Sequence, residues 1–184
     1  MEVFMLRPSM ELVFPMASLL CATGSAVYDA ASRRIPNFLT LPGLAFGLAL
    51  HGFLGGWRES ATAALGALVC GLIFLVFYLA GGMGAGDVKL IAAVGCLAGF
   101  SRIAPLLVFT GLAGGVMAIA MALARGQLVT TLHNMFALAM HHRTMGLAPH
   151  PEFNVGNEQA LRLPYALAIA AGCALDLCLQ IVER

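Results

Sequence analysis

Two aspartates stand apart from the other acidic residues of this sequence, because each follows directly on a long apolar run. Asp29 closes the first run, and Asp87 follows the third run after a glycine-rich segment, residues 81–86. An ionisable side chain at the edge of an apolar span is costly unless it faces water or a partner, so it marks a candidate functional site. Two carboxylates held close could act as general acid and general base on a water molecule and a peptide bond, because the first charge raises the pKa of the second. Which carboxyl starts protonated stays open, since a coupled pair titrates as a unit.

The composition indicates that lipid, not water, surrounds most of the chain. Of the 184 residues, 60% are hydrophobic and 10% are charged, against roughly 25% charged in an ordinary soluble domain. The formal net charge of +1 gives no basic field that would attract nucleic acid. We therefore expect one integral membrane domain, residues 1–184, whose surroundings are the lipid bilayer and which binds no nucleic acid.

The apolar runs predict the number of crossings, since a spanning helix needs about 20 apolar residues. A further run, Leu90 to Phe100, is only 11 residues long and is expected to be a short or partly embedded helix. The first run is expected to be a retained helix and not a cleaved signal peptide. The fold class is thus all-α, a polytopic membrane helix bundle with about six transmembrane helices, and the five clear runs are roughly 12–28, 38–54, 61–80, 104–124 and 163–182.

Counting crossings places both aspartates on one face of the membrane. Two predicted spans separate Asp29 from Asp87, so the chain returns to the face it left. Cationic residues favour the cytoplasm for that face. Six lie in loops of the same side as the aspartates and four on the other side: Arg33, Arg34, Lys89, Arg125, Arg143 and Arg162 against Arg7, Arg58, Arg102 and Arg184.

The glycines before Asp87 are expected to free the backbone for positive φ and for close approach to a ligand chain; they are Gly81, Gly82, Gly84 and Gly86. Lys89 could lower the pKa of Asp87, although an interfacial lysine that only reaches for water is the favoured interpretation. A purely structural alternative also exists. In it, both aspartates are helix-end residues, Asp29 balanced by Arg33 or Arg34 and Asp87 by Lys89.

Other residues are given structural roles. The glycine pairs 43/47, 95/99 and 111/115 would let neighbouring helices approach closely. Residues 127–140 place apolar side chains at helical spacing and predict an interfacial helix. Asp176 is expected at the interface of the opposite face. The histidines at 133, 141, 142 and 150 lack the spacing of a metalloprotease helix, so neither a metal nor another cofactor is expected.

At its polar motifs the sequence resembles the type IV prepilin peptidases, in particular the short form that serves Flp or tight-adherence pili. Gly84-Ala85-Gly86-Asp87 matches the GxGD signature that this family shares with presenilin-like intramembrane proteases. Arg34-Ile35-Pro36-Asn37 follows Asp29, and the run from Leu163 to Ala170 opens the last span. Longer members carry paired CxxC motifs and also methylate the new N-terminus, and those motifs are not found here.

The resemblance implies that Asp29 and Asp87 form a catalytic pair, with Gly84, Gly86 and Lys89 in the active-site loop. It implies a membrane-embedded aspartyl endopeptidase that removes the leader of prepilins and pseudopilins at the cytoplasmic face of the bacterial inner membrane. Two alternatives remain at this point. One is a small proton- or cation-coupled transporter or channel component that uses the same two aspartates, and the other is a structural subunit. The oligomeric state and the role of residues 125–162 stay open.

Overall fold

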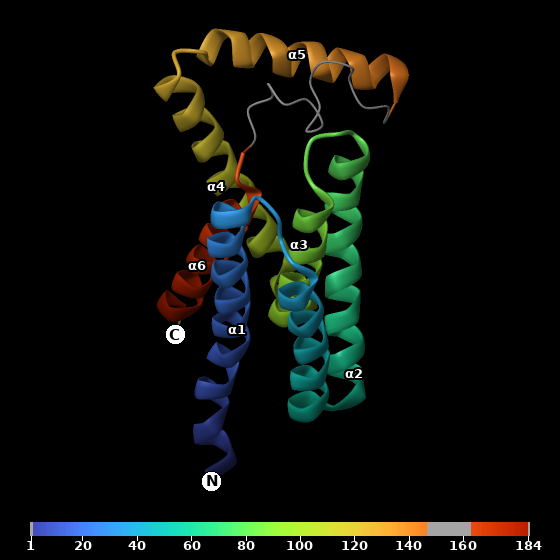
Figure 1. Cartoon of the computed structure of the whole chain (residues 1–184). Coiled ribbons are helices and arrows are strands. Elements are labelled where there is room, and N and C mark those ends of the chain that lie inside the picture. The colour runs from blue at the N-terminus through green and yellow to red at the C-terminus, as the bar shows by residue number, and fades with distance from the viewer. Residues whose placement is uncertain (1, 147–162, 184) are drawn as a thin grey trace.

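A computed structural model describes residues 2–146 and 163–183 as an all-α bundle (Figure 1). The all-α prediction is thereby confirmed, while the single domain over residues 1–184 stays a prediction. Four helices are long and apolar enough to cross a membrane: Leu12–Ser32, Asn37–Leu79, Phe100–Ala124 and Tyr165–Val182. In chain order the elements are α1 (Glu2–Ser32), α2 (Asn37–Leu79), α3 (Ala85–Ala98), the 3₁₀ turn η1 (Phe100–Arg102), α4 (Ile103–Ala124), α5 (Leu128–Met145) and α6 (Tyr165–Val182).

Helix α2 is a hairpin of two antiparallel arms and therefore supplies two crossings. Its 43 residues reverse direction at Gly56, where φ is 78° and ψ is −175°, a conformation that glycine adopts without a Cβ clash. The Ser60 hydroxyl donates a hydrogen bond of 3.0 Å to the Leu48 carbonyl across the turn. The arms correspond to the predicted spans 38–54 and 61–80, and Figure 1 shows them side by side.

Helix α3 is the short element at the centre of the bundle. Its 14 residues rise about 21 Å, less than the roughly 30 Å hydrocarbon core of a bilayer. It packs against α1, α2 and α6, and every residue from Leu90 to Ala98 except Ala92 is buried. Protein on all sides explains why the helix is apolar all round. The predicted segment from Leu90 to Phe100 began too late, because the helix starts at Ala85.

Small residues allow α2 and α3 to touch backbone to backbone. A Cβ at Gly66 would lie 2.7 Å from the Gly95 carbonyl oxygen, and a Cβ at Gly95 would lie 2.7 Å from Cys70 Sγ. Gly47 is also close to α3, since its Cβ would lie 3.2 Å from the Leu97 nitrogen. The expected close approach at residues 43/47 and 95/99 is confirmed. It is wrong for the pair 111/115, where an added Cβ would meet nothing within 4 Å.

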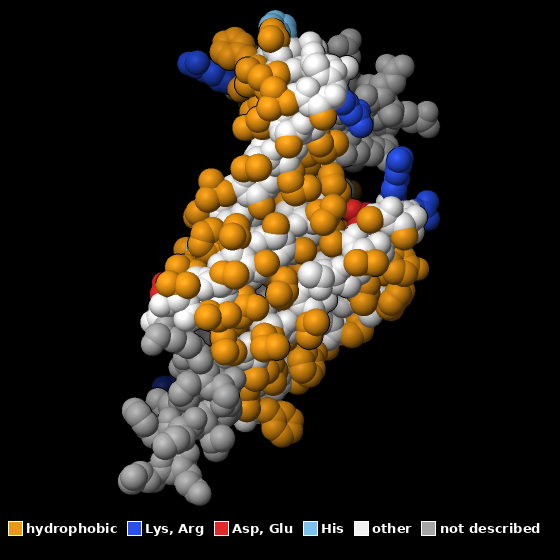
Figure 2. Space-filling model, turned by 90° about the vertical axis from the view of Figure 1, so that its left-hand side faces the viewer, with side chains coloured by type: hydrophobic (Ala, Val, Ile, Leu, Met, Phe, Trp, Pro, Cys, Tyr) orange, Lys and Arg blue, Asp and Glu red, His pale blue; other side chains and the backbone are white. Residues whose placement is uncertain are grey.

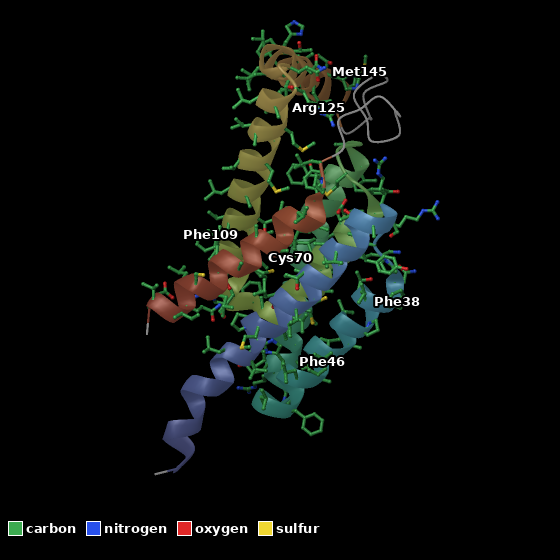
Figure 3. The ribbon with its side chains drawn as sticks, turned by 60° about the vertical axis from the view of Figure 1, so that its left-hand side comes forward. Phe38, Phe46, Cys70, Phe109, Arg125 and Met145 are labelled. Carbon is green, nitrogen blue, oxygen red and sulfur yellow. The ribbon has the colours of Figure 1, made fainter. Side chains whose placement is uncertain are left out.

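The outer surface of the bundle is apolar along its length, as expected of a multi-pass membrane protein. Figure 2 shows one face on which hydrophobic side chains cover the middle, while most of the visible Lys and Arg lie toward the end that holds α5. In Figure 3, α6 runs alongside α1 and Cys70 lies inside the bundle. On α4 the exposed side chains form a lipid-facing stripe of Val108, Leu112, Val116, Ile119 and Leu123.

The far end of the bundle, which holds η1, is fastened by a buried ion pair. Arg102 donates to Asp176 at 2.7 Å, and the Asp176 side chain is only 3% exposed. Gln180 donates to the second oxygen of Asp176, also at 2.7 Å. The expected position of Asp176 at a membrane interface stays a prediction, but the sequence did not reveal that η1 and α6 enclose the carboxylate. Its placement away from Asp29 and Asp87 was right.

Replacing Gly66 by alanine should destabilise the protein, because the new Cβ would press on the Gly95 carbonyl and force α2 and α3 apart. Overpacking of this kind costs about 1–3 kcal/mol, so we expect a lower Tm in detergent micelles. Gly111→Ala is the matched control, since its Cβ would meet open space and alanine favours helix. A Gly66→Ala variant as stable as the Gly111→Ala variant would contradict the close helix contact.

Candidate active site

Asp29 lies in the last turn of α1, in line with the buried face of that helix. Ser18, Ala22 and Ala26 are buried at intervals of four residues, and Asp29 follows three residues later on the same side. The carboxylate itself is half-buried. Helix α1 then ends at Arg33, which has a positive φ of 54° and whose N–H donates to the Asp29 carbonyl at 2.7 Å. The helix thus ends within about one turn of Asp29, the last residue of its buried face.

Asp87 lies in the first turn of α3 and caps that helix. Its Oδ2 accepts a hydrogen bond of 3.1 Å from the Gly84 N–H, and its own N–H donates to the Gly84 carbonyl at 3.2 Å. The positive end of the helix dipole favours a carboxylate at this position. The side chain is half-buried. Asp87 is therefore fixed in direction by the helix that it begins.

The segment that joins α1 to α2 lies against the start of α3 and brings the two aspartates to one end of the bundle. A Cβ added at Gly86 would be 3.1 Å from Cβ of Ile35. Lys89 Nζ donates to Asn37 Oδ1 at 3.0 Å, so this lysine bridges α3 and the start of α2. The parity argument from the sequence, which put Asp29 and Asp87 at one face, agrees with this arrangement (Figure 1).

The glycines before Asp87 act differently from what the sequence suggested. Only Gly81 has a positive φ, 78°, so that expectation was wrong for Gly82, Gly84 and Gly86. At Gly86 the missing side chain gives room to Ile35 of the same chain. A Cβ at Gly84 would come within 3.3 Å of the Asp87 carboxylate. These two glycines therefore shape the first turn of α3 and not a left-handed loop.

The electrostatics of the site make Asp87 easier to protonate than an ordinary carboxyl. Burial raises the pKa of the Asp87 carboxyl to about 6, the Gly84 N–H opposes this rise, and the charge of Asp29 adds to it. Asp29 is thus within electrostatic reach of Asp87. Among the described residues neither carboxylate forms an ion pair, and Lys89 binds Asn37 instead. The structural alternative, in which nearby cations balance both aspartates, does not hold in this arrangement.

Sequence reasoning gave no role to Tyr165, the first residue of α6, which the structure places near Asp87. The ring packs on the core cluster that includes Leu90, and the phenol is within electrostatic reach of Asp87. The only sequence signal was its place in the motif that opens the last span. Tyr165 is a third polar group at the candidate site, contributed by a third helix.

An apolar groove of about 420 Å³ runs between α3 and the two arms of α2. It reaches the site at Val88, the residue after Asp87. No ionisable carboxylate or amine lines it. The lining residues are Leu44, Leu48, Ala64, Ala67, Leu68, Gly71, Leu72, Leu75, Val88 and Cys96.

The sequence profile of the type IV leader peptidase family matches residues 14–119. The chain therefore belongs to this family. The matched region contains Asp29, Gly84, Gly86, Asp87 and Lys89, and it ends before α5 and Tyr165.

Curated relatives carry the name prepilin leader peptidase/N-methyltransferase. The chain is 38% identical over 107 residues to that of Neisseria gonorrhoeae, covering 54% of this chain and 37% of the relative. It is 36% identical over 104 residues to that of Aeromonas hydrophila, covering 53% and 36%. The match thus spans little more than a third of the relatives' length. No solved structure matches the chain significantly. The family does not favour the alternative of a transporter or channel component.

Removing the Asp29 charge should lower the pKa of Asp87, because a neighbouring negative charge disfavours ionisation. We expect Asp29→Asn to shift the Asp87 titration from about 6 to lower pH, so the group ionises earlier as pH rises. Infrared titration of the carboxyl band, assigned by difference from Asp87→Asn, measures this shift. Glu59→Gln, which changes an exposed carboxylate at the turn of α2, should leave the midpoint unchanged. An unchanged midpoint in Asp29→Asn would show that the two carboxyls are not coupled.

Proposed function

We propose that this chain is a membrane-embedded aspartyl endopeptidase that cleaves the leader peptide of prepilins and pseudopilins. The observation that carries the proposal is a pair of half-buried carboxylates, on α1 and α3, that interact electrostatically and pair with no cation of residues 2–146 and 163–183. Burying charge without a partner is costly, so such a pair needs a reason other than stability. Membership of a leader peptidase family supplies the reaction class.

The proposed chemistry uses the two carboxyls as acid and base. The ionised carboxylate takes a proton from a water molecule, whose oxygen forms a bond to the scissile carbonyl carbon. The protonated carboxyl donates its proton to the carbonyl oxygen. When the tetrahedral intermediate collapses, the C–N bond breaks, and the carboxyl that took the water's proton gives it to the leaving nitrogen. The other carboxylate takes a hydroxyl proton back from the intermediate as the carbonyl forms again. A pKa near 6 for Asp87 suits a group that must hold and release a proton near neutral pH.

The site is proposed to face the cytoplasm from a bacterial inner membrane. Arg33, Arg34 and Lys89 lie at the site end of the bundle, whereas Arg58 and Arg102 lie toward the far end. Cytoplasmic loops carry the excess of Lys and Arg in membrane proteins. The relatives named for prepilins come from Neisseria and Aeromonas, which supports prepilins as the substrate class. The proposal concerns leader cleavage alone and not methylation.

The proposal is tested by leader cleavage with the purified chain in detergent and a prepilin substrate. Asp29→Asn and Asp87→Asn should each lower the rate by a factor of about 10²–10⁴, the usual contribution of a general acid or base. Circular dichroism checks that each variant keeps its helices, and Glu59→Gln, at the opposite end, should cleave as wild type does. If either asparagine variant cleaves at the wild-type rate, the proposed pair is wrong.

Tyr165 is proposed to position the reacting groups through its hydroxyl, which interacts electrostatically with Asp87. Tyr165→Phe keeps the ring that packs on the hydrophobic core cluster but removes one hydrogen-bond donor. We expect kcat to fall roughly tenfold, the value of one hydrogen bond to a charged group, with little change in KM. The pH at which activity is half-maximal should also move. Tyr78→Phe, an exposed tyrosine near the end of α2, is the control. A Tyr165→Phe enzyme with unchanged kcat and pH profile would remove this role.

A further inference from the structure

Helix α5 is neither a membrane span nor part of the bundle core. It begins after a sharp corner at Gly126, where φ is 64°, and lies across the site end of the bundle (Figures 1 and 3). Although it has 18 residues, it is not apolar enough to be among the candidate spans. Among the described helices it contacts only α4. Most of its surface is therefore free of the rest of the described protein.

One face of α5 is an exposed apolar stripe, defined here as Val129, Leu132, Phe136 and Met140. These residues follow one another at intervals of three and four, which places them on one side of a helix. Their exposed fractions are 81%, 57%, 69% and 46%. A stripe of this kind at the end of a membrane bundle calls for an apolar neighbour.

The charges around the stripe are of one sign. The sequence contains no Asp or Glu between Asp87 and Glu152. Arg143 is exposed and, three residues after Met140, extends the stripe at the C-terminal end of α5. Arg125 is exposed at the corner before α5, where Figure 3 labels it. An apolar helix face bordered by cations matches a membrane surface that carries anionic headgroups.

The stripe also continues a surface that lipid already covers. Figure 2 shows hydrophobic side chains along the visible face of the bundle and at the end that holds α5. On α4 this surface includes Val116, Ile119 and Leu123, the last of which lies five residues before the start of α5. The occupant that fits both helices is thus the same bilayer.

We propose that α5 is an anchor that lies in the plane of the membrane at the site end, with its apolar stripe in the lipid and Arg125 and Arg143 against anionic headgroups. The anchor is independent of the peptidase activity, because it uses no residue of the candidate site. It assigns a lipid partner to a helix outside the region that the family profile matches.

Tryptophan fluorescence of the full chain in vesicles tests the proposal. Trp57 is the only tryptophan, so Trp57→Phe gives a silent background. In it, Phe136→Trp reports on the stripe, and Thr130→Trp reports on an exposed position about a third of a turn away. Phosphatidylcholine vesicles with brominated acyl chains, prepared with and without phosphatidylglycerol, supply the quencher.

The Phe136→Trp protein should emit at shorter wavelength and be quenched by the brominated lipid at least about twofold more than the Thr130→Trp protein. Phosphatidylglycerol should increase that quenching, and Arg143→Gln should reduce the increase. Equal quenching at the two positions would overturn the anchor. So would emission that depends on the protein-to-lipid ratio and not on bromine, because a second copy would then cover the stripe. Quenching that ignores phosphatidylglycerol would overturn the anionic partner.

Discussion

The structure depends on enclosing a helix that is too short to cross a bilayer by itself. Backbone groups in hydrocarbon must be satisfied internally, and ends of a short helix cannot reach water on both sides. Helix α3 does not need to reach water at both ends, because it packs against α1, α2 and α6. The contact of Gly66 with Gly95 lets α2 and α3 approach at backbone distance. Because α3 is enclosed, its first turn, with Asp87, is held against the end of α1 and not against lipid.

The sequence predicted the parts of the fold that depend on local composition. Apolar runs of sufficient length predicted the spans, including both arms of α2, and the number of spans between Asp29 and Asp87 predicted that they share one end. The start of α3 was missed because Ala85 and Gly86 end a glycine-rich segment that was expected to be a loop, whereas the Asp87 side chain caps the helix that they begin. Local signals of this kind can be overridden by a single side-chain hydrogen bond.

Contacts between residues far apart in the chain could not be predicted from the sequence. The ion pair of Asp176 was not predicted, because its partner, Arg102, lies 74 residues away and no local pattern links the two. The glycine pair 111/115 was expected to allow close helix packing because its spacing equals that of 43/47. Only the tertiary structure decides which glycine meets another helix. The position of Tyr165 at the site also depends on the tertiary structure, because α6 returns to the site end after the chain has passed through α4.

The carboxylates at the two ends of the bundle differ in whether a cation is paired with them. At the far end the Asp176 carboxylate has a cation and an amide as partners, which is what a buried charge requires. At the site end, Asp87 accepts from the N–H of Gly84, the residue before α3. It pairs with no cation in the described part of the chain, and a second carboxylate is in electrostatic reach. The cap favours the ionised form and burial favours the neutral form, and the resulting pKa of about 6 lies between these extremes. An exposed cap would stay ionised at neutral pH, and a fully enclosed carboxyl without a donor would stay neutral. A carboxyl poised between them can exchange its proton at little cost, which is the property that the proposed acid–base chemistry needs.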